Sequence, residues 1–322
     1  MAQKLKSGVV DRGVLKTGVI GAGVFGAFHA RKNAALPRAD FVGVYDADAG
    51  RASMLAAECD TRSFASADAL FEAVEAVTIA APAPLHFPLA QSALLAGLHV
   101  YVEKPLALTL AEADALIALA GRKGLVLQVG HQERFVLAAM GLPRGQDLPR
   151  SLEFGRAGPP TGRGEDVPAA LDLMIHDLDL ARLFGFSAPV KVDACGSYDE
   201  TIATLTFDGG RTASFIVSRR ASARRRAMKA VYDDGAIEID FLARTILNDT
   251  RASLAANDFA AGPAALNDPL GASIDAFIAA ILDGGGAIVD GRAGRGALEW
   301  ALMVEDARTA LAQSAGETRK SA

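Results

Sequence analysis

Three glycines that follow a short apolar run constrain this chain more than any other feature of its sequence. Residues 14–20 are mostly apolar and lead into Gly21, Gly23 and Gly26, after which an alanine-rich helical pattern reaches about residue 36. The first glycine permits a tight turn, the second lets the backbone approach a pyrophosphate, and the third lets the helix pack closely on the strand. This order of strand, turn and helix predicts the first unit of a dinucleotide-binding fold.

An acidic residue follows where such a fold needs one. A second apolar run at 41–45 ends in Asp46, about 20 residues after Gly26. There a carboxylate accepts hydrogen bonds from the ribose of NAD and disfavours the 2′-phosphate of NADP. We expect NAD as cofactor, with NADP possible because Arg51 is near enough in sequence to accept that phosphate. The contacts expected from this part of the chain are Gly21, Gly23, Val24, Phe25, Gly26 and Asp46.

The alternation of strand and helix patterns continues to about residue 130. Further strands are indicated at 77–80, 100–102 and 126–129, with helical patterns between them. This rhythm predicts a doubly wound parallel sheet of the Rossmann type, in which ligands bind at the carboxyl ends of the strands. We therefore predict a dinucleotide-binding domain at 1–131 and a substrate-binding and oligomerisation domain at 132–322.

Glu103, Lys104 and Pro105 end the strand at 100–102. A proline cannot donate to a sheet ladder and biases the residue before it away from helix, so the strand stops and its last side chains face open space. We expect Lys104 to take part in the chemistry, although a lysine at a strand end is also commonly a surface residue. The cofactor contacts expected at these strand ends are Ala81, Pro82, His86, Glu103 and Lys104. For His86, a histidine that caps a turn would look the same.

A general base is indicated in the second half of the chain. The pattern at 169–184 predicts a helix on which Asp172 and His176 are four positions apart and so share a face, which would let the carboxylate orient the imidazole. Asp177 would point elsewhere. An oriented imidazole is what a general base requires. The glycine- and proline-rich segment 155–168 is expected to form a loop that folds over the site.

Strand-like segments dominate the rest of the chain and predict an α+β domain with an open, mainly antiparallel sheet. They are 152–154, 190–196, 202–207, 212–218, 228–232 and 236–241. The alternation of apolar and polar residues along 203–207 predicts one face packed on helices and one face free for substrate or a partner subunit. We expect a homodimer or homotetramer formed through this sheet.

A cluster of arginines, including Arg219, Arg220 and Arg226, follows one of these strands. Such a cluster is either a solvated hairpin end or an anion site for a phosphorylated substrate. Because Arg219 and Arg220 are adjacent, at most one of them would belong to a pocket if the strand persists that far.

The composition excludes several functional classes. With 322 residues, of which 51% are hydrophobic, the chain is long enough for about two domains. A net charge of −5 argues against a nucleic-acid or anionic-membrane partner. No membrane-length apolar run is present, and the polar segment 3–12 leads into no signal-type core, so we expect a cytoplasmic protein. The two cysteines suggest neither a disulfide framework nor a metal site.

These residues together resemble the Gfo/Idh/MocA family of nicotinamide-dependent oxidoreductases over nearly the full length of the chain. The resemblance rests on the glycine motif, on Asp46, and on the segments 103–105 and 172–177. It implies an NAD(P)-dependent oxidoreductase acting on CH-OH groups. It also implies a cis bond before Pro105 and an active site that contains Lys104, Asp172 and His176.

Within the family, the segments 130–135 and 172–177 look most like nucleotide-sugar 3-dehydrogenases that act on UDP-N-acetylglucosamine, although Val136 and Leu137 stand where that subgroup commonly has Asn-Pro. This resemblance implies oxidation of a sugar C3 hydroxyl, with either His176 or Lys104 as the proton acceptor. The substrate contacts expected are Arg134, Asp172, His176 and Arg219. The alternatives are a dehydrogenase of a free sugar or inositol-type polyol, and a non-catalytic NAD(P)-binding regulator.

Overall fold

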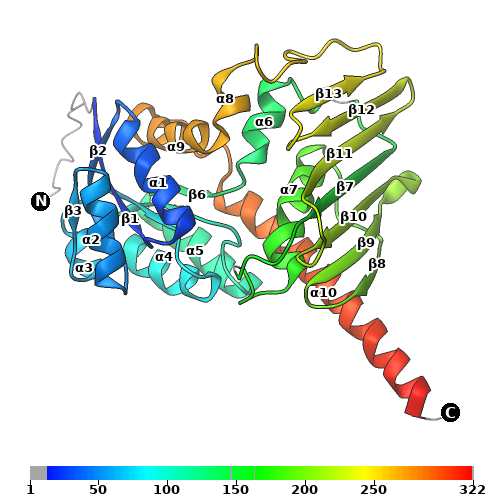
Figure 1. Cartoon of the computed structure of the whole chain (residues 1–322), viewed down its shortest axis with the longest axis horizontal. Helices are drawn as coiled ribbons and strands as arrows, with labels where there is room; N and C mark the ends of the chain where they lie inside the picture. Colours follow the sequence, from blue (N-terminus) through cyan, green and yellow to red (C-terminus); the bar gives the residue numbers. More distant parts are fainter. Residues whose placement is uncertain (1–12, 146, 163, 321–322) are drawn as a thin grey trace, which may run out of the picture.

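Two sheets lie side by side, each covered by helices, in the computed structural model of this chain (Figure 1). The structure describes residues 13–320 apart from 146 and 163, so the polar segment 3–12 lies outside the described residues. The first sheet has six parallel strands in the order β3-β2-β1-β4-β5-β6, and the second has seven strands in the order β13-β12-β11-β7-β10-β9-β8. The predicted fold class is confirmed.

The first sheet has the strand order of a Rossmann fold. Its strands are β1 (Leu15–Ile20), β2 (Ala39–Tyr45), β3 (Arg62–Ser63), β4 (Ala76–Ile79), β5 (His99–Val102) and β6 (Leu127–Val129). The helical segments between them are α1 (Val24–Ala35), α2 (Ala49–Glu58), α3 (Ala67–Phe71), η1 (Ala83–Leu85), α4 (His86–Leu95) and α5 (Leu110–Lys123). The order reverses between β1 and β4, and ligands of such sheets bind at the carboxyl ends of the strands beside this reversal.

Local sequence signals fix several helix ends. Helix α5 begins at a capping box, in which the Thr109 side chain accepts from the Glu112 backbone and the Glu112 side chain accepts from the Thr109 backbone. It ends at Gly124, which adopts a left-handed conformation. Helix α1 differs because no side chain caps its first turn, so its N–H groups are left to a ligand or solvent.

The second sheet is mainly antiparallel, with one parallel pair, β7 and β10. Its strands are β7 (Ser151–Ala157), β8 (Lys191–Gly196), β9 (Glu200–Thr206), β10 (Thr212–Ser218), β11 (Arg225–Tyr232), β12 (Gly235–Asp240) and β13 (Thr245–Asn248). The remaining helical segments are α6 (Glu133–Ala139), η2 (Ala170–Met174), α7 (Ile175–Leu183), η3 (Asp208–Gly210), α8 (Ala264–Asn267), α9 (Pro269–Ala279), η4 (Ala280–Gly284) and α10 (Gly291–Lys320).

The predicted alternation along β9 is confirmed by burial. Ala203 and Leu205 are buried on the face that α7 and α10 cover, whereas Ile202 is 52% exposed on the other face (Figure 1). Phe154 and Phe215 stack on neighbouring strands of the buried face with ring centroids 5.2 Å apart. The second sheet therefore presents one apolar core and one open face.

Helix α9 follows the strands of the second sheet in the chain but packs on the first sheet. Its residues Ile274 and Phe277 share a buried cluster with Leu15 and Tyr101 of the first sheet. The Tyr101 hydroxyl lies 3.0 Å from the Ser273 hydroxyl. We therefore propose the division of the chain between residues 131 and 132, although the last helices contact both parts. No helix among the described residues has the length and apolarity needed to cross a membrane.

Candidate active site

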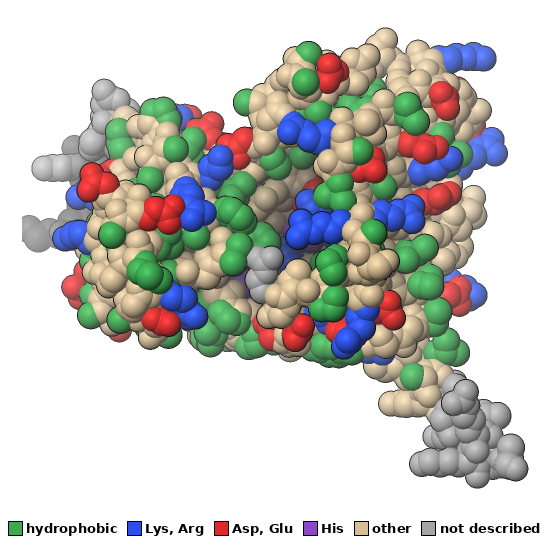
Figure 2. Space-filling view, viewed as in Figure 1, with side chains coloured by type: hydrophobic (Ala, Val, Ile, Leu, Met, Phe, Trp, Pro, Cys, Tyr) green, Lys and Arg blue, Asp and Glu red, His purple; other side chains and the backbone are tan. Residues whose placement is uncertain are grey.

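A cavity of about 270 Å³ lies between the two sheets, at the carboxyl ends of β4 and β5. The second sheet contributes residues of β7 and β11, and the segment 161–176 supplies the rest of that wall. Figure 2 shows a hollow between the two halves of the molecule, with Lys and Arg side chains gathered at its edge. The expected site residues that line the cavity are Phe25, Ala81, Pro82, His86, Glu103, Lys104, Asp172 and His176.

The glycine turn has the geometry of a pyrophosphate cradle. Gly21 has φ +100°, and a Cβ there would lie 2.5 Å from the Ala80 carbonyl oxygen. A Cβ on Gly26 would lie 1.8 Å from the Gly21 carbonyl oxygen, so the helix packs on the strand only because both are glycines. A Cβ on Gly23 would meet nothing within 4 Å, which leaves its backbone open to a ligand. Beside the uncapped α1 N-terminus, these residues fit a dinucleotide.

Asp46 is tied to this turn. Its carboxylate accepts from the backbone N–H of Ala22 at 2.6 Å and of Asp48 at 2.8 Å, and from the Arg51 guanidinium at 2.9 Å. Burial alone would raise the pKa of Asp46, but these donors outweigh it and lower the pKa below its usual range. A fixed, ionised carboxylate therefore lies beside the turn where the ribose of a dinucleotide belongs. Arg51 partly neutralises it.

His86 joins two strand ends. Its Nδ1 lies 2.6 Å from the Pro105 carbonyl oxygen and its Nε2 lies 2.8 Å from the Ala81 carbonyl oxygen. Burial lowers the pKa of His86, and the neutral ring can donate to only one of these carbonyls, but both nitrogens face protein atoms, so a cofactor would meet the ring carbons. The imidazole lines the cavity and also secures the turns after β4 and β5.

Glu103 lines the cavity, but its carboxylate already has protein partners. Oε1 lies 2.7 Å from His29 Nε2 and accepts from the Gln132 side chain at 3.2 Å. Gly130 is needed beside it, because a Cβ there would lie 2.9 Å from the carboxylate. Oε1 of Glu103 therefore acts within the protein, and the contact of Glu103 with the cofactor stays a prediction.

Lys104 forms a direct pair with Asp172. Its Nζ donates to Asp172 Oδ1 and to the Asp172 backbone carbonyl, both at 2.7 Å. The bond between Lys104 and Pro105 is cis, as the family resemblance implied. The predicted contact between Asp172 and His176 is wrong. Both side chains line the cavity, as their spacing predicted, but Lys104 takes the Asp172 carboxylate.

The carboxylate beside His176 comes from another helix. Glu133 Oε2 lies 3.0 Å from His176 Nδ1, an ion-pair contact without hydrogen-bond alignment. Glu133 also pairs with the buried Arg156 at 3.0 Å, and Arg156 pairs with Asp177 at 2.7 Å. His131 packs edge-on against the His176 ring at 5.8 Å. Sequence reasoning missed the roles of Glu133 and Arg156, although Glu133 stands within the segment 130–135 that it singled out.

The surroundings of His176 and Glu133 give these two side chains different charges. Burial lowers the pKa of His176 to about 4, against the opposing effect of Glu133, so the imidazole is neutral near pH 7. Burial would raise the pKa of Glu133, but the charge that His176 gains when protonated, and then the charge of Arg156, bring that pKa well below the usual range. A neutral imidazole beside a fixed carboxylate can accept a proton and be stabilised once it has done so.

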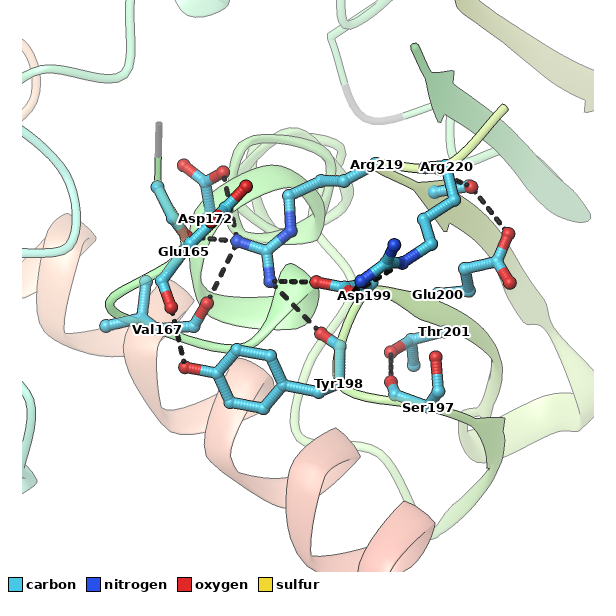
Figure 3. A network of polar contacts seen from close by, with 12 residues as sticks. Glu165, Val167, Asp172, Ser197, Tyr198, Asp199, Glu200, Thr201, Arg219 and Arg220 are labelled. Atoms are coloured by element: carbon cyan, nitrogen blue, oxygen red, sulfur yellow. Dashed lines mark hydrogen bonds and ion pairs between the residues drawn. The ribbon is translucent and has the colours of Figure 1, made fainter. Parts of the chain in front are cut away.

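Arg219 holds the loop over the site and does not line the cavity (Figure 3). Its guanidinium donates to the carbonyls of Gly164, Val167 and Tyr198, the last two at 3.0 and 3.2 Å, and pairs with Asp199 at 3.1 Å. It is 8% exposed. The expected contact of Arg219 with substrate is thus replaced by a structural one, because three carbonyl groups converge on the guanidinium.

The glycine- and proline-rich loop does fold over the site, as predicted. Thr161, Gly164, Asp166 and Val167 line the cavity. Asp166 Oδ2 accepts from the backbone N–H of Ala83 at 3.0 Å, which fastens the loop to the first turn after β4. The loop therefore spans the cavity and is bonded at both sides.

Two other predicted arginines lie away from the cavity. Arg134 forms a two-bond pair with the fully buried Asp179, at 2.6 and 2.7 Å, so it is not available to a substrate in the cavity. Arg220 is exposed and donates to Asp199 at 2.7 Å. Of the three arginines proposed for an anion, Arg226 is the one that lines the cavity. Strand β11 begins at residue 225, earlier than the sequence pattern suggested, and this brings Arg226 into the sheet.

Known proteins share both sequence and structure with this chain. A family model described as "Oxidoreductase family, NAD-binding Rossmann fold" matches residues 15–131. UDP-N-acetylglucosamine 3-dehydrogenase of Acidithiobacillus ferrooxidans is 38% identical over 300 residues, which cover 89% of this chain and 95% of that protein. A solved structure of that enzyme has 39% identity and a TM-score of 0.83, covering 92% of this chain and 98% of the other.

A more distant structure shares the fold. Scyllo-inositol dehydrogenase from Lactobacillus casei, with bound NAD(H) and scyllo-inositol, has 20% identity and a TM-score of 0.77, covering 92% of this chain and 97% of the other. The family match, the extended relative and the glycine turn agree with one another. This chain belongs to the Gfo/Idh/MocA family of oxidoreductases with an NAD-binding Rossmann fold, and it acts on CH-OH groups.

Proposed function

We propose that this protein uses NAD to oxidise the C3 hydroxyl of a nucleotide sugar of the UDP-N-acetylglucosamine type. The observation that carries the proposal is the meeting of Lys104, paired with Asp172, and the neutral His176 in one cavity at the carboxyl end of β5. The substrate class is supported by the Acidithiobacillus ferrooxidans relative, of which the match covers 95%. A non-catalytic regulator would have no need of these paired groups.

The reacting hydroxyl is held between Lys104 and His176. Bound NAD supplies the hydride acceptor. His176 accepts the hydroxyl proton because burial keeps it neutral, and Glu133 stabilises the imidazolium that forms. Lys104 donates a hydrogen bond to the substrate oxygen, and Asp172 fixes the direction of its ammonium group. We thus assign the proton acceptor to His176 and a positioning and electrostatic role to Lys104.

A dehydrogenase of a free sugar or inositol is the second candidate. It is supported by scyllo-inositol 2-dehydrogenase of Bacillus subtilis, which is 27% identical over 227 residues and is covered to 64%. Arg226 in the cavity favours the first candidate, because a half-exposed guanidinium there suits a phosphate group and finds no negative charge in a polyol.

The test is a substrate panel offered with NAD, followed by absorbance of the reduced cofactor. The panel contains UDP-N-acetylglucosamine, other UDP-sugars, free sugars and inositols. We expect turnover with a UDP-sugar and loss of that turnover in the variant His176→Ala. Reduction of NAD by an inositol but by no UDP-sugar would replace the proposal with the second candidate. Product analysis by NMR would show whether C3 carries the new carbonyl.

We also propose that the open face of the second sheet joins copies of this chain. Ile202 of β9 and Ile216 of β10 are directly paired across the ladder, and both side chains are about half exposed. Leu247 of β13 is 62% exposed. Apolar side chains side by side on an open sheet face are typical of a subunit contact.

A further inference from the structure

A second cavity adjoins the candidate active site. It measures about 240 Å³ and is enclosed by α6, the start of β11, the segment after β12 and helix α8. Arg226 lines both cavities, so the two adjoin at this residue. We infer that the second cavity holds the nucleoside of the substrate, with the diphosphate at Arg226 and the sugar in the first cavity. This inference rests on the proposed function.

The charge around Arg226 suits a diphosphate. In the antiparallel pair of β11 and β7, Arg226 is directly opposite Arg156. Like charges in that relation repel one another. Arg156 is matched by Glu133 and Asp177, whereas Arg226, among the described residues, has a single ion-pair contact at 3.8 Å to Glu133. A diphosphate would supply the missing negative charge and accept from the planar fork of the guanidinium.

The pKa of Arg226 points the same way. It is lowered, first by the charge of Arg156 and then by burial, with Glu133 and Asp177 opposing the change. Arg224 adds to the lowering. A cation whose ionisation is disfavoured by other cations lies in an excess of positive potential, and such a position attracts an anionic ligand.

The walls of the second cavity suit a flat ring with polar edges. Phe241 and Phe259 supply aromatic surface, and the Arg244 guanidinium lies 5.6 Å from the Phe259 ring centroid. Asn267 and Gln132 add side-chain amides, whose nitrogens also donate to the Phe259 carbonyl and to Glu103, respectively. Aromatic surface, a cation and amides together provide stacking and hydrogen bonds to the carbonyl and N–H edges of a base.

Arg244 has an uncommon backbone conformation. Its φ is +59°, in the left-handed region that residues other than glycine seldom adopt. Such conformations concentrate at ligand sites, where the surrounding structure maintains them. Here the turn between β12 and β13 places the exposed Arg244 side chain at the wall of the second cavity.

The separation between His176 and Arg226 suits one sugar ring. The Glu133 carboxylate contacts His176 at 3.0 Å and Arg226 at 3.8 Å, so a single side chain separates the proposed proton acceptor from the proposed diphosphate anchor. A sugar whose C3 hydroxyl meets His176 would carry its anomeric diphosphate toward Arg226. The nucleoside would then continue into the second cavity.

Binding measurements test this assignment separately from turnover. Titration calorimetry with the NAD-loaded protein would use UDP, UDP-N-acetylglucosamine and N-acetylglucosamine 1-phosphate, which lacks the nucleoside. The variant Arg244→Ala should weaken UDP and the UDP-sugar about fivefold or more, because it removes a cation that faces the base. The affinity for the sugar 1-phosphate should stay within twofold. The variant Phe241→Leu should change the three affinities in the same pattern.

Arg251→Ala is the matched control, since Arg251 is also an exposed arginine of the second half but lines neither cavity. Thermal melting would confirm that each variant is folded. If Arg244→Ala, Phe241→Leu and Arg251→Ala all bind UDP as the parent does, the second cavity is not the nucleoside site, even where UDP-N-acetylglucosamine is a substrate. If UDP binding weakens as expected but no UDP-sugar reduces NAD, the nucleoside site stands and C3 oxidation is refuted.

Discussion

Replacing Glu133 with glutamine should slow the reaction and shift its pH dependence, because the change removes the charge beside His176 and keeps the shape of the side chain. The carboxylate lies 3.0 Å from His176 Nδ1. At an effective dielectric constant of 20, a unit charge at that distance stabilises the imidazolium by roughly 5.5 kcal/mol. Glutamine retains an oxygen that faces the ring, so only part of this stabilisation is lost. We take the loss as about 2 kcal/mol, the amount by which a charged hydrogen-bond partner stabilises more than a neutral one.

We therefore expect kcat for the oxidation in Glu133→Gln to fall roughly 30-fold, since each 1.36 kcal/mol is a factor of ten. The sign of the pH effect follows from the same charge. Burial lowers the pKa of His176 to about 4 and Glu133 opposes that lowering. Without Glu133 the pKa falls further, so the acid limb of kcat/KM, where His176 becomes protonated, moves to lower pH.

The assay is the initial rate of NAD reduction from about pH 3 to about pH 9, so that an acid limb at or below the His176 pKa of about 4 lies within the range. Asp177→Asn is the matched control, because Asp177 shares Arg156 with Glu133 and makes no ion pair with His176 among the described residues. Both variants should lose thermal stability, since each weakens a buried pair. If Glu133→Gln keeps the parental kcat and acid limb while melting earlier, Glu133 serves only Arg156 and its assigned role is refuted.

Four further changes have distinct expected outcomes. His176→Ala should lower kcat by about 10²–10⁴ and leave NAD affinity by calorimetry unchanged, whereas a packing residue would lose stability and keep its rate. The parent should bind NAD more tightly than NADP, because a 2′-phosphate about 4 Å from the Asp46 carboxylate is repelled by about 4 kcal/mol at a dielectric constant of 20. Asp46→Ala should reduce the ratio of NAD affinity to NADP affinity at least tenfold. Equal binding of the two cofactors by the parent would contradict this. Arg219→Ala should destabilise the protein by roughly 2–4 kcal/mol in chemical denaturation and raise KM for every accepted sugar alike, since it acts through the loop; a selective effect on UDP-sugars would return Arg219 to the substrate site. Ile216→Lys should reduce the mass measured by light scattering to that of a smaller assembly or monomer, and an unchanged mass would exclude the open sheet face.

The features that the sequence predicted well are those held by short-range geometry. The turn at Gly21 and Gly26 admits no side chain, and Asp46 follows a strand of fixed length, so their spacing in sequence determines their positions in space. Lys104 was predicted because Pro105 ends its strand, and ligands of a parallel sheet bind at the edge where its strands end. In each case one β/α unit contains the whole relation.

The features that were missed depend on contacts between separate elements. Asp172 and His176 share a face and line one cavity, but Lys104, which follows a strand of the other sheet, takes the Asp172 carboxylate. Glu133 reaches His176 from α6, and spacing within either helix carries no information about that meeting. Arg219 and Arg226 are both arginines of one cluster in the sequence. Arg219 holds the loop because three carbonyl groups converge on its guanidinium, and the sequence does not reveal that convergence.

The exchange of carboxylate partners has a mechanistic consequence. If Asp172 oriented His176, as its place in the sequence suggested, one carboxylate would control the base and Lys104 would act alone. Instead Asp172 pairs with Lys104 while Glu133 faces the neutral imidazole of His176, so different carboxylates serve the two groups that we propose to contact the hydroxyl. Asp172→Asn should then change KM and kcat through the position of Lys104 and leave the acid limb in place, whereas Glu133→Gln should move it. A shared shift of the acid limb in both variants would mean that the four residues titrate as one unit, and the assignment of the proton to His176 would have to be withdrawn.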